Sequence, residues 1–333
     1  MGALTRVAGT AAATLTHAFA GPAEEPATVD GAVTVTGTDP DGDLVFTGTA
    51  TAAAAGGGYE FTMPAQTQLG LIDVTWSGTV GGTLLIERDL VEIVGGFLFT
   101  LRQGRDSDET LQNTDKYPTA DLLRARTEVE QECEWICDQA WVPRYRRVVL
   151  DGTGIVDLVL PTGGDLWRAG TLMRGVRTVR TASIAARPGQ TPVPLTGAQL
   201  AALAVRPDGT LRRTDDGVWT AGDGNVVLEY EYGADAAPAD LVRAALTRFR
   251  DRLNFDKRQI PDRAVSFTIA EAGTYRLSLP DAYRTGIPEV DAAYGRYSRR
   301  VSDSSGPGGR AAPASRSIDY DPQYGSIFHG GRR

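Results

Sequence analysis

The chain has 333 residues, of which 41% are hydrophobic and 23% are charged, and its formal net charge is −8 at pH 7. This length accommodates two or more domains of roughly 100–200 residues each. The acidic balance argues against nucleic-acid binding through a broadly basic surface, and two cysteines do not form a disulfide framework.

Arginine dominates the basic residues, because only two of the 34 are lysines. Its planar guanidinium group makes bidentate contacts with carboxylates, which suits protein interfaces. A GC-rich genome would produce the same bias, so this observation leaves both explanations open.

The opening 23 residues resemble a signal peptide only weakly, because Thr10, Thr14, Thr16 and His17 interrupt the apolar stretch. No run approaches the roughly 20 apolar residues of a membrane helix. We therefore expect no cleaved leader, no membrane partner and synthesis in a cytoplasm.

Residues from about 10 to 100 alternate between apolar and polar positions. Val33 and Val35 alternate before a turn at Asp39–Gly42, and the segments around Phe61 and Trp76 repeat the pattern. Short strands with turn signals every ten or so residues predict an immunoglobulin-like β-sandwich over residues 1–104. The "DPDGD" stretch at 39–43 lacks the spacing of a calcium loop, so we expect a tight turn there.

A helix is predicted over residues 119–142, after a polar stretch that follows Arg105. Apolar residues recur at spacings of three and four and form one stripe: Leu122, Ala125, Val129, Cys133, Ile136 and Ala140. The two cysteines then share one face as small apolar residues. Acidic residues occupy the other faces: Glu128, Glu130, Glu132 and Glu134.

Strands return over residues 145–233, and a second long helix is predicted over 240–254. The apolar stripe of this helix is Val242, Ala245, Leu246, Phe249 and Leu253, and its other faces carry Arg243, Arg248, Arg250 and Arg252. We expect this basic face to pair with the acidic face of the first helix, either within one chain or across a subunit boundary.

The last stretch, residues 303–333, is rich in Gly, Ser and Pro and is expected to be disordered on its own. Apolar and aromatic residues nevertheless recur in it: Ile318, Tyr320, Tyr324, Ile327 and Phe328. This spacing predicts an extended tail that becomes ordered when these side chains bind a partner chain.

Catalytic patterns are missing from the sequence. With two histidines, one near each end, a His-centred triad or HExxH zinc site cannot form, and there is no P-loop or GxSxG. Paired carboxylates are numerous, so a glycosidase-type acid/base pair stays open. We predict no enzyme activity, no cofactor and no metal.

The order of parts resembles the head-to-tail connector, or adaptor, proteins of long-tailed bacteriophages, especially those of actinobacterial hosts. The likeness begins in "YPTADLLRARTEVEQECEWICDQAWVPR", continues through "GVWTAGDGNVVLEYEYGADAAPADLVRAALTRFRDRL" and closes with "GIPEVDAAYGRY". It covers roughly Pro118 to Tyr297, and the N-terminal domain lies outside it.

We therefore expect an α+β multidomain chain. The strand pattern predicts its N-terminal all-β Ig-like sandwich, and the resemblance implies a helical connector core with β-hairpin insertions over 105–302, followed by the extended C-terminal tail. It implies a ring of about twelve copies at the head–tail junction of the virion, assembled in the bacterial host cytoplasm. Its partners would be other copies of itself, the portal protein, and the tail terminator or next neck ring. Genomic DNA would pass through the channel without sequence-specific binding.

On this basis the tail residues form the predicted portal anchor, and the charged faces form the predicted contacts between subunits. The rival hypotheses are another neck or tail protein, of terminator or tail-tube type, and a surface carbohydrate-binding module. An exposed row of aromatics on one sheet face would favour the carbohydrate module, whereas burial of Trp76, Tyr59 and Phe61 would remove it.

Overall fold

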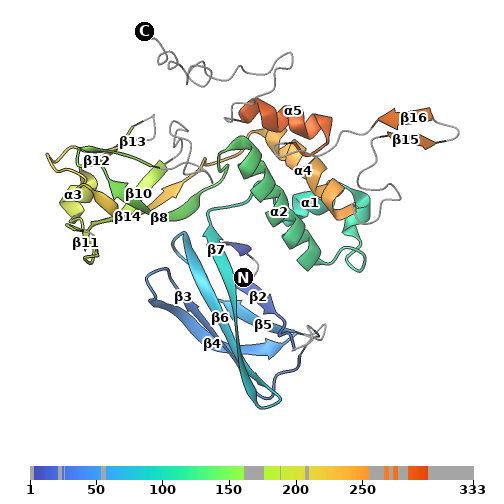
Figure 1. The fold of residues 1–333 in the computed structure, drawn as a ribbon. Helices are drawn as coiled ribbons and strands as arrows, with labels where there is room; N and C mark the ends of the chain where they lie inside the picture. The colour runs from blue at the N-terminus through green and yellow to red at the C-terminus, as the bar shows by residue number, and fades with distance from the viewer. Residues whose placement is uncertain are drawn as a thin grey trace, which may run out of the picture.

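The described part of the chain forms three units, each with its own hydrophobic core (Figure 1). The computed structural model describes residues 4–21, 25, 27–53, 58–160, 176–187, 189–206, 210–254, 266–269, 273–276 and 284–298. We call the three units the barrel, the helical unit and the sheet unit. In Figure 1 the barrel lies at the bottom, with the sheet unit and the helical unit above it.

The barrel is one mixed seven-stranded sheet with strand order β1-β7-β6-β3-β4-β5-β2. Its strands are β1 (Leu4–Ala8), β2 (Ala13–His17), β3 (Val33–Thr38), β4 (Leu44–Ala52), β5 (Tyr59–Met63), β6 (Gly70–Val80) and β7 (Thr83–Val94). The first strand runs parallel to β7, and the other pairs are antiparallel. Alternate residues point inward, so Val35, Val74 and Trp76 are fully buried in its core.

The predicted immunoglobulin-like sandwich is wrong. The nine-residue strand β4 pairs with β3 along most of its length and with β5 through Thr51 and Ala52. It therefore joins what would be two separate sheets into one sheet that curls into a nearly closed barrel. Alternation in the sequence shows which face of each strand is buried, but it does not show which strands are neighbours.

The helical unit packs around α2 (Thr119–Cys137), α4 (Ala239–Asn254) and α5 (Pro288–Tyr297), with the short α1 (Leu101–Asp106) and the 3₁₀ turn η1 (Glu109–Gln112) beside them. Leu122, Val129 and Cys133 on α2 lie in one core with Phe249 and Tyr294. The helix α2 ends before the expected residue 142, because Asp138 adopts a left-handed backbone with φ 53° and caps it.

The sheet unit contains a four-stranded sheet of order β11-β10-β14-β8 and a three-stranded sheet of order β12-β13-β9. Their bounds are β8 (Arg144–Gly152), β9 (Asp157–Val159), β10 (Val176–Ile184), β11 (Val193–Pro194), α3 (Gly197–Ala201), β12 (Leu203–Val205), β13 (Thr210–Arg213) and β14 (Gly222–Tyr232). Trp219, Leu228 and Tyr230 are fully buried between them.

Gly233 makes the connection between the sheet unit and the helical unit. It follows β14 with φ +104°, a conformation that only glycine adopts readily. A Cβ at this position would lie 2.3 Å from the Val142 carbonyl oxygen, and the next amide, Ala234 N, donates to Ala140 O at 3.1 Å. The chain can thus pass from β14 into α4 while it stays against the 140–142 segment that follows α2.

Candidate functional site

A buried cluster of charges lies where the three units meet. We call it the charged joint, and it consists of Arg6 on β1, Glu92 on β7, Glu130 and Glu134 on α2, and Arg144 on β8. Arg144 and Glu130 have fully buried side chains. Five ionisable groups in such a position are uncommon, because charged side chains are almost never buried unless they are paired.

Arg6 ties the barrel to α2. Its Nε lies 2.8 Å from Glu92 Oε2, its Nη2 lies 2.8 Å from Glu134 Oε2, and its Nη1 lies 3.3 Å from Glu130 Oε2. One guanidinium group therefore holds a neighbouring strand and two successive turns of a helix from another unit.

Arg144 makes the equivalent connection from the sheet unit. Its Nη2 lies 2.7 Å from Glu134 Oε1 and 3.3 Å from Glu130 Oε2, and its Nε lies 3.9 Å from Glu92 Oε1. The remaining Glu130 oxygen accepts from the Leu98 amide at 2.8 Å. Every carboxylate of the joint is thus shared between the two arginines.

The joint holds three carboxylates against two guanidinium groups, and a third buried arginine, Arg126 on α2, lies close enough to interact electrostatically with Glu130. Burial raises the pKa of Glu130, although Arg144 and Arg6 act in the opposite direction. Burial also lowers the pKa of Arg6, but the attraction of Glu134, Glu92 and Glu130 outweighs it and the pKa is raised. The first effect favours the neutral form of Glu130, and the second keeps Arg6 charged.

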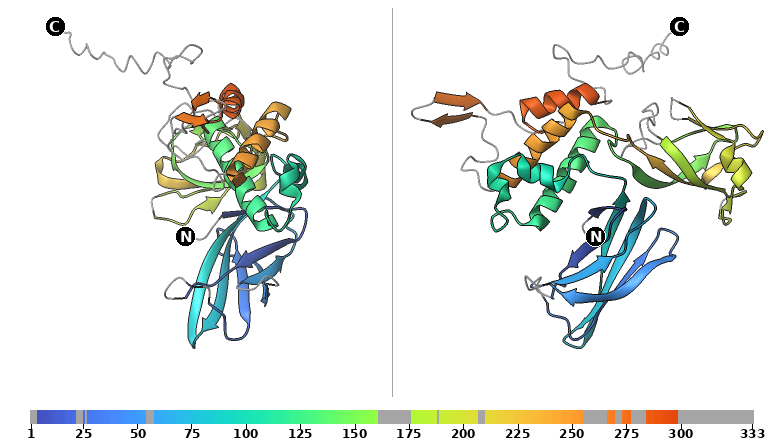
Figure 2. Two further views of the ribbon diagram at one scale, coloured as in Figure 1. Left: turned by 90° about the vertical axis from the view of Figure 1, so that its right-hand side faces the viewer. Right: turned by 180° about the vertical axis from the view of Figure 1, so that it is seen from behind.

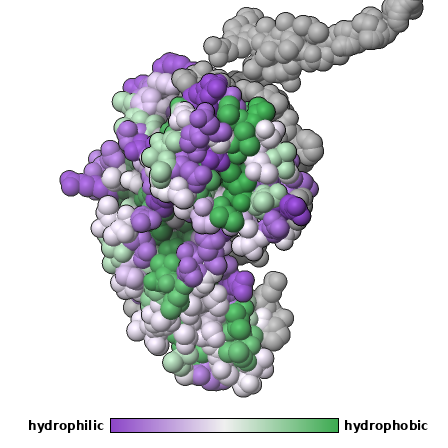
Figure 3. Space-filling model, turned by 90° about the vertical axis from the view of Figure 1, so that its left-hand side faces the viewer, coloured by the Kyte–Doolittle hydropathy of each residue, from purple (hydrophilic) through white to green (hydrophobic). Residues whose placement is uncertain are grey.

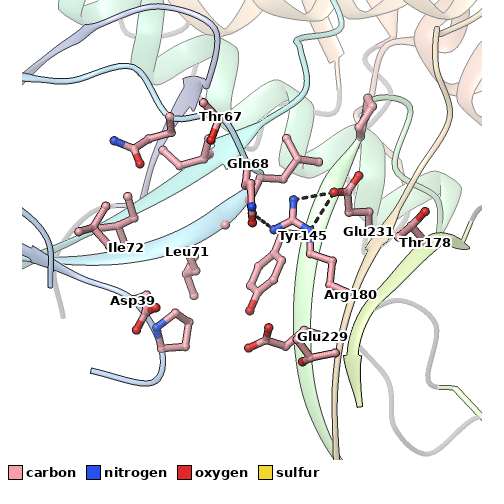
Figure 4. Close-up of a pocket in the computed structure, with 18 of the residues that line it drawn as sticks. Asp39, Thr67, Gln68, Leu71, Ile72, Tyr145, Thr178, Arg180, Glu229 and Glu231 are labelled. Carbon is pink, nitrogen blue, oxygen red and sulfur yellow. Dashed lines mark hydrogen bonds and ion pairs between the residues drawn. The ribbon is translucent and has the colours of Figure 1, made fainter. Parts of the chain in front are cut away.

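A cleft of about 980 Å³ separates the barrel from the sheet unit (Figure 4). Arg180 crosses it, with Nε 2.9 Å from Glu231 Oε1 and with Nη1 donating to the Leu69 carbonyl of the barrel. Figure 3 shows the surface hollowed between the two units, with apolar side chains gathered in the hollow.

A second arginine reaches from the sheet unit to the barrel loop that lines this cleft. Arg147 donates to the Pro40 carbonyl at 2.6 Å and lies 2.7 Å from Asp41 Oδ1, so it holds the 39–43 turn. That stretch is a turn closed on its own backbone, with Asp39 N donating to Asp43 O at 3.0 Å. Burial raises the pKa of Tyr145, which faces the cleft beside Glu229 (Figure 4). The polar groups Arg180 and Arg147 thus link the barrel and the sheet unit across the cleft.

The predicted charged faces are placed as follows. Within the chain, Glu128 pairs with Arg252 at 2.5 Å, while Arg248 pairs with Glu132 at 2.6 Å and with Asp251 at 2.7 Å. Arg250 donates to Ser107 O at 3.2 Å, and Arg243 is exposed. Glu130 and Glu134 lie in the charged joint, away from these pairs. The tail residues Ile318, Tyr320, Tyr324, Ile327 and Phe328 lie outside the described residues.

Sequence reasoning missed Arg6, Glu92 and Arg144. A signal was present, because Arg6 and Glu92 interrupt apolar stretches that form strands, "TRVA" and "LVEIV". A lone charge inside a buried strand requires a partner. The identity of that partner could not be read, since Glu130 is 124 positions from Arg6.

Other site types find no support among the described residues. There, no three His, Cys, Asp or Glu side chains gather as a metal site. No helix within the described ranges is long and apolar enough to cross a membrane. Trp76 is buried in the barrel core, and Tyr59 and Phe61 pack against that core.

No protein-family model and no curated protein matches the chain. Among solved structures it is similar to a chain of the neck of an empty gene transfer agent particle computed with C6 symmetry, with 16% identity, 63% of this chain and 94% of that chain covered, and a TM-score of 0.37. A chain of the virion of the native particle gives 16% identity, 62% and 93% coverage and a TM-score of 0.39. A chain of the native neck computed with C12 symmetry gives 15% identity, 59% of this chain and 92% of that chain covered, and a TM-score of 0.35.

Proposed function

We propose that this chain is a structural protein of the neck of a tailed phage or phage-like particle, and that it acts there as the head-to-tail connector. The observation that carries the proposal is the charged joint, which uses buried arginine–carboxylate contacts to tie three separately cored units together. This is the construction of a part that transmits force between neighbours. The sequence resemblance over Pro118 to Tyr297 supplies the identity of the part.

In this role the chain forms a closed ring, about twelve copies by the resemblance, between the portal and the next neck ring or terminator. Cyclic rings are built from head-to-tail contacts between different patches of the same chain. The exposed Arg243 and the partly exposed pair of Glu128 and Arg252 are the charged groups we propose for such contacts. The tail, with Tyr320, Tyr324 and Phe328, is the proposed portal anchor.

The strand-to-helix join at Gly233 supports the same role. It places β14 and α4 end to end, so that α4 packs within the helical unit while the sheet unit projects beside it (Figure 2). A projecting sheet gives each copy a second surface through which a neighbour can be reached.

Deletion of the gene tests the proposal. Cells that make particles without this chain are expected to accumulate DNA-filled heads and separate tails, and expression of the wild-type chain restores joined particles. Joined, infectious or DNA-transferring particles in the absence of the chain would contradict the connector role. Loss of heads, or of tails alone, would place the chain elsewhere in the particle.

A further inference from the structure

The sheet unit presents one long strand edge. In the four-stranded sheet β8 pairs only with β14, so its other edge has no strand partner in the described part of the chain. This strand has nine residues, whereas the opposite edge strand β11 has two and ends in Pro194. Proteins usually protect a long strand edge, because unpaired N–H and C=O groups recruit another strand.

Only part of this edge is available. Arg144 is held in the charged joint, and Arg147 is held against the barrel loop at Pro40. Beyond them the strand continues through Val148, Val149 and Leu150 to Asp151, and Val149 is 60% exposed. The accessible part is therefore about four residues long and centred on aliphatic side chains.

A second feature has the matching length. The strands β15 (Ser266–Ile269) and β16 (Gly273–Arg276) form a hairpin of four residues on each side, and each pairs only with the other among the described residues. A two-stranded hairpin is at best marginally stable in water without further strands or a surface to pack on. Phe267 is the register partner of Tyr275, and aromatic residues of this kind are enriched in β-strands.

The hairpin and the β8 edge lie at opposite ends of one helix. The strand β14, the neighbour of β8, leads into the start of α4, and the hairpin follows the end of α4. This helix has 16 residues and is therefore about 24 Å long. Figures 1 and 2 show the hairpin on one flank of the helical unit and the sheet unit on the other.

We propose that the β15–β16 hairpin of one copy adds to the β8 edge of the next copy, at Val148–Asp151, and extends its four-stranded sheet. The inference rests on the proposed ring, and it names the contact that closes it. Two different patches on opposite flanks form a heterologous contact, which repeats from copy to copy until the ring closes. Strand addition supplies backbone hydrogen bonds, and repetition around the ring adds avidity.

Cysteine pairing between two singly substituted full-length chains tests the proposal. One chain carries Val149→Cys, and the other carries either Phe267→Cys or Thr268→Cys, because neighbouring strand residues face opposite sides. The native Cys133 and Cys137 are free but buried, which limits their interference. Val193→Cys on β11 is the matched control, since Val193 is 66% exposed on the other edge of the same sheet.

The chains are mixed, oxidised and separated on a non-reducing gel, while native mass measurements record whether a ring forms. We expect a disulfide-linked dimer with Val149→Cys at least tenfold more abundant than with Val193→Cys, from one of the two hairpin positions. Equal or absent crosslinking overturns the strand contact. A chain that carries both substitutions, Val149→Cys and the hairpin cysteine, and forms only an intramolecular disulfide overturns the contact between copies as well. If a ring forms without this crosslink, the strand contact is wrong and the proposed function stands. If no ring forms and particles join normally in the deletion strain, the proposed function is wrong.

Discussion

Replacing Arg144 with methionine is the most informative single perturbation of the charged joint. Its guanidinium group is fully buried and lies within 4 Å of three carboxylates, the nearest being Glu134 Oε1 at 2.7 Å. Methionine keeps much of the length and removes the charge, so the three carboxylates lose one of the two guanidinium groups that pair with them. Removing one partner of a buried ionic network costs about 3–5 kcal/mol, because a charge is left without compensation.

This loss is large for a domain whose whole stability is roughly 5–15 kcal/mol. For two units that unfold together, a body of about 150–250 residues, it corresponds to a fall in Tm of about 6–20 °C. Differential scanning calorimetry of the full chain measures it, since the three units need not unfold together. Arg124→Met is the matched control: Arg124 lies on α2 with a 71% exposed side chain and pairs with Asp121 at 2.8 Å. An exposed pair of this kind contributes at most about 1 kcal/mol.

A double variant separates the charge effect from lost packing. If the unpaired carboxylate is the cost, Arg144→Met combined with Glu134→Met unfolds at a higher temperature than Arg144→Met alone. The reasoning is refuted if Arg144→Met and Arg124→Met shift the transition equally, because the joint would then contribute no more than a surface pair.

Three further predictions concern single positions. Because burial raises the pKa of Glu130, the folded state keeps a proton there that the unfolded chain has lost, and this contribution to stability falls as pH rises through the raised pKa. Glu130→Gln should therefore lose less stability at pH 7 than at pH 4 in urea titrations, and a deficit that grows with pH would contradict the shift. Gly233→Ala should lower the unfolding midpoint clearly more than Gly31→Ala. Both glycines have positive φ, but a Cβ at Gly233 lies 2.3 Å from Val142 O, whereas a Cβ at Gly31 meets no atom within 4 Å. Equal losses would show that the close approach at Gly233 has no energetic cost. Arg248→Ala should destabilise by about 2 kcal/mol or more and Arg252→Ala by less than about 1 kcal/mol, because the Arg248 side chain is 11% exposed and that of Arg252 is 45% exposed. The reverse order in thermal melts would contradict this account of the α2–α4 contact.

The sequence was most informative where periodicity and burial are local. The stripe through Leu122, Val129 and Cys133 predicted a buried helix face, and these residues lie in the helical core. The end of that helix was missed, because aspartate is not a residue type that predicts a helix C-terminus as glycine does, although Asp138 adopts the left-handed conformation that ends α2. The barrel was missed for another reason, since pairing β4 with both β3 and β5 is a relation between strands and not a property of any one of them.

The charges illustrate the same limit. The acidic row on α2 was visible, but only the fold shows that Glu130 turns inward to Arg6 and Arg144 while Glu128 and Glu132 meet α4. Helical spacing predicts which residues share a face, and it does not predict which of several faces a neighbouring unit covers. The contact between the barrel and α2 joins residues more than 120 positions apart, and one sequence holds no record of that proximity.

The connector role is tested most directly by a photo-crosslinking amino acid at Tyr324 during particle production, with the captured partner identified by mass spectrometry of purified particles. The account predicts capture of the portal protein, whereas the same amino acid at Val149 on the sheet unit is expected to capture another copy of this chain and not the portal. Capture of only a terminator or tail-tube protein would move the chain further down the neck, and particles that contain the chain but yield no captured partner would contradict the anchor.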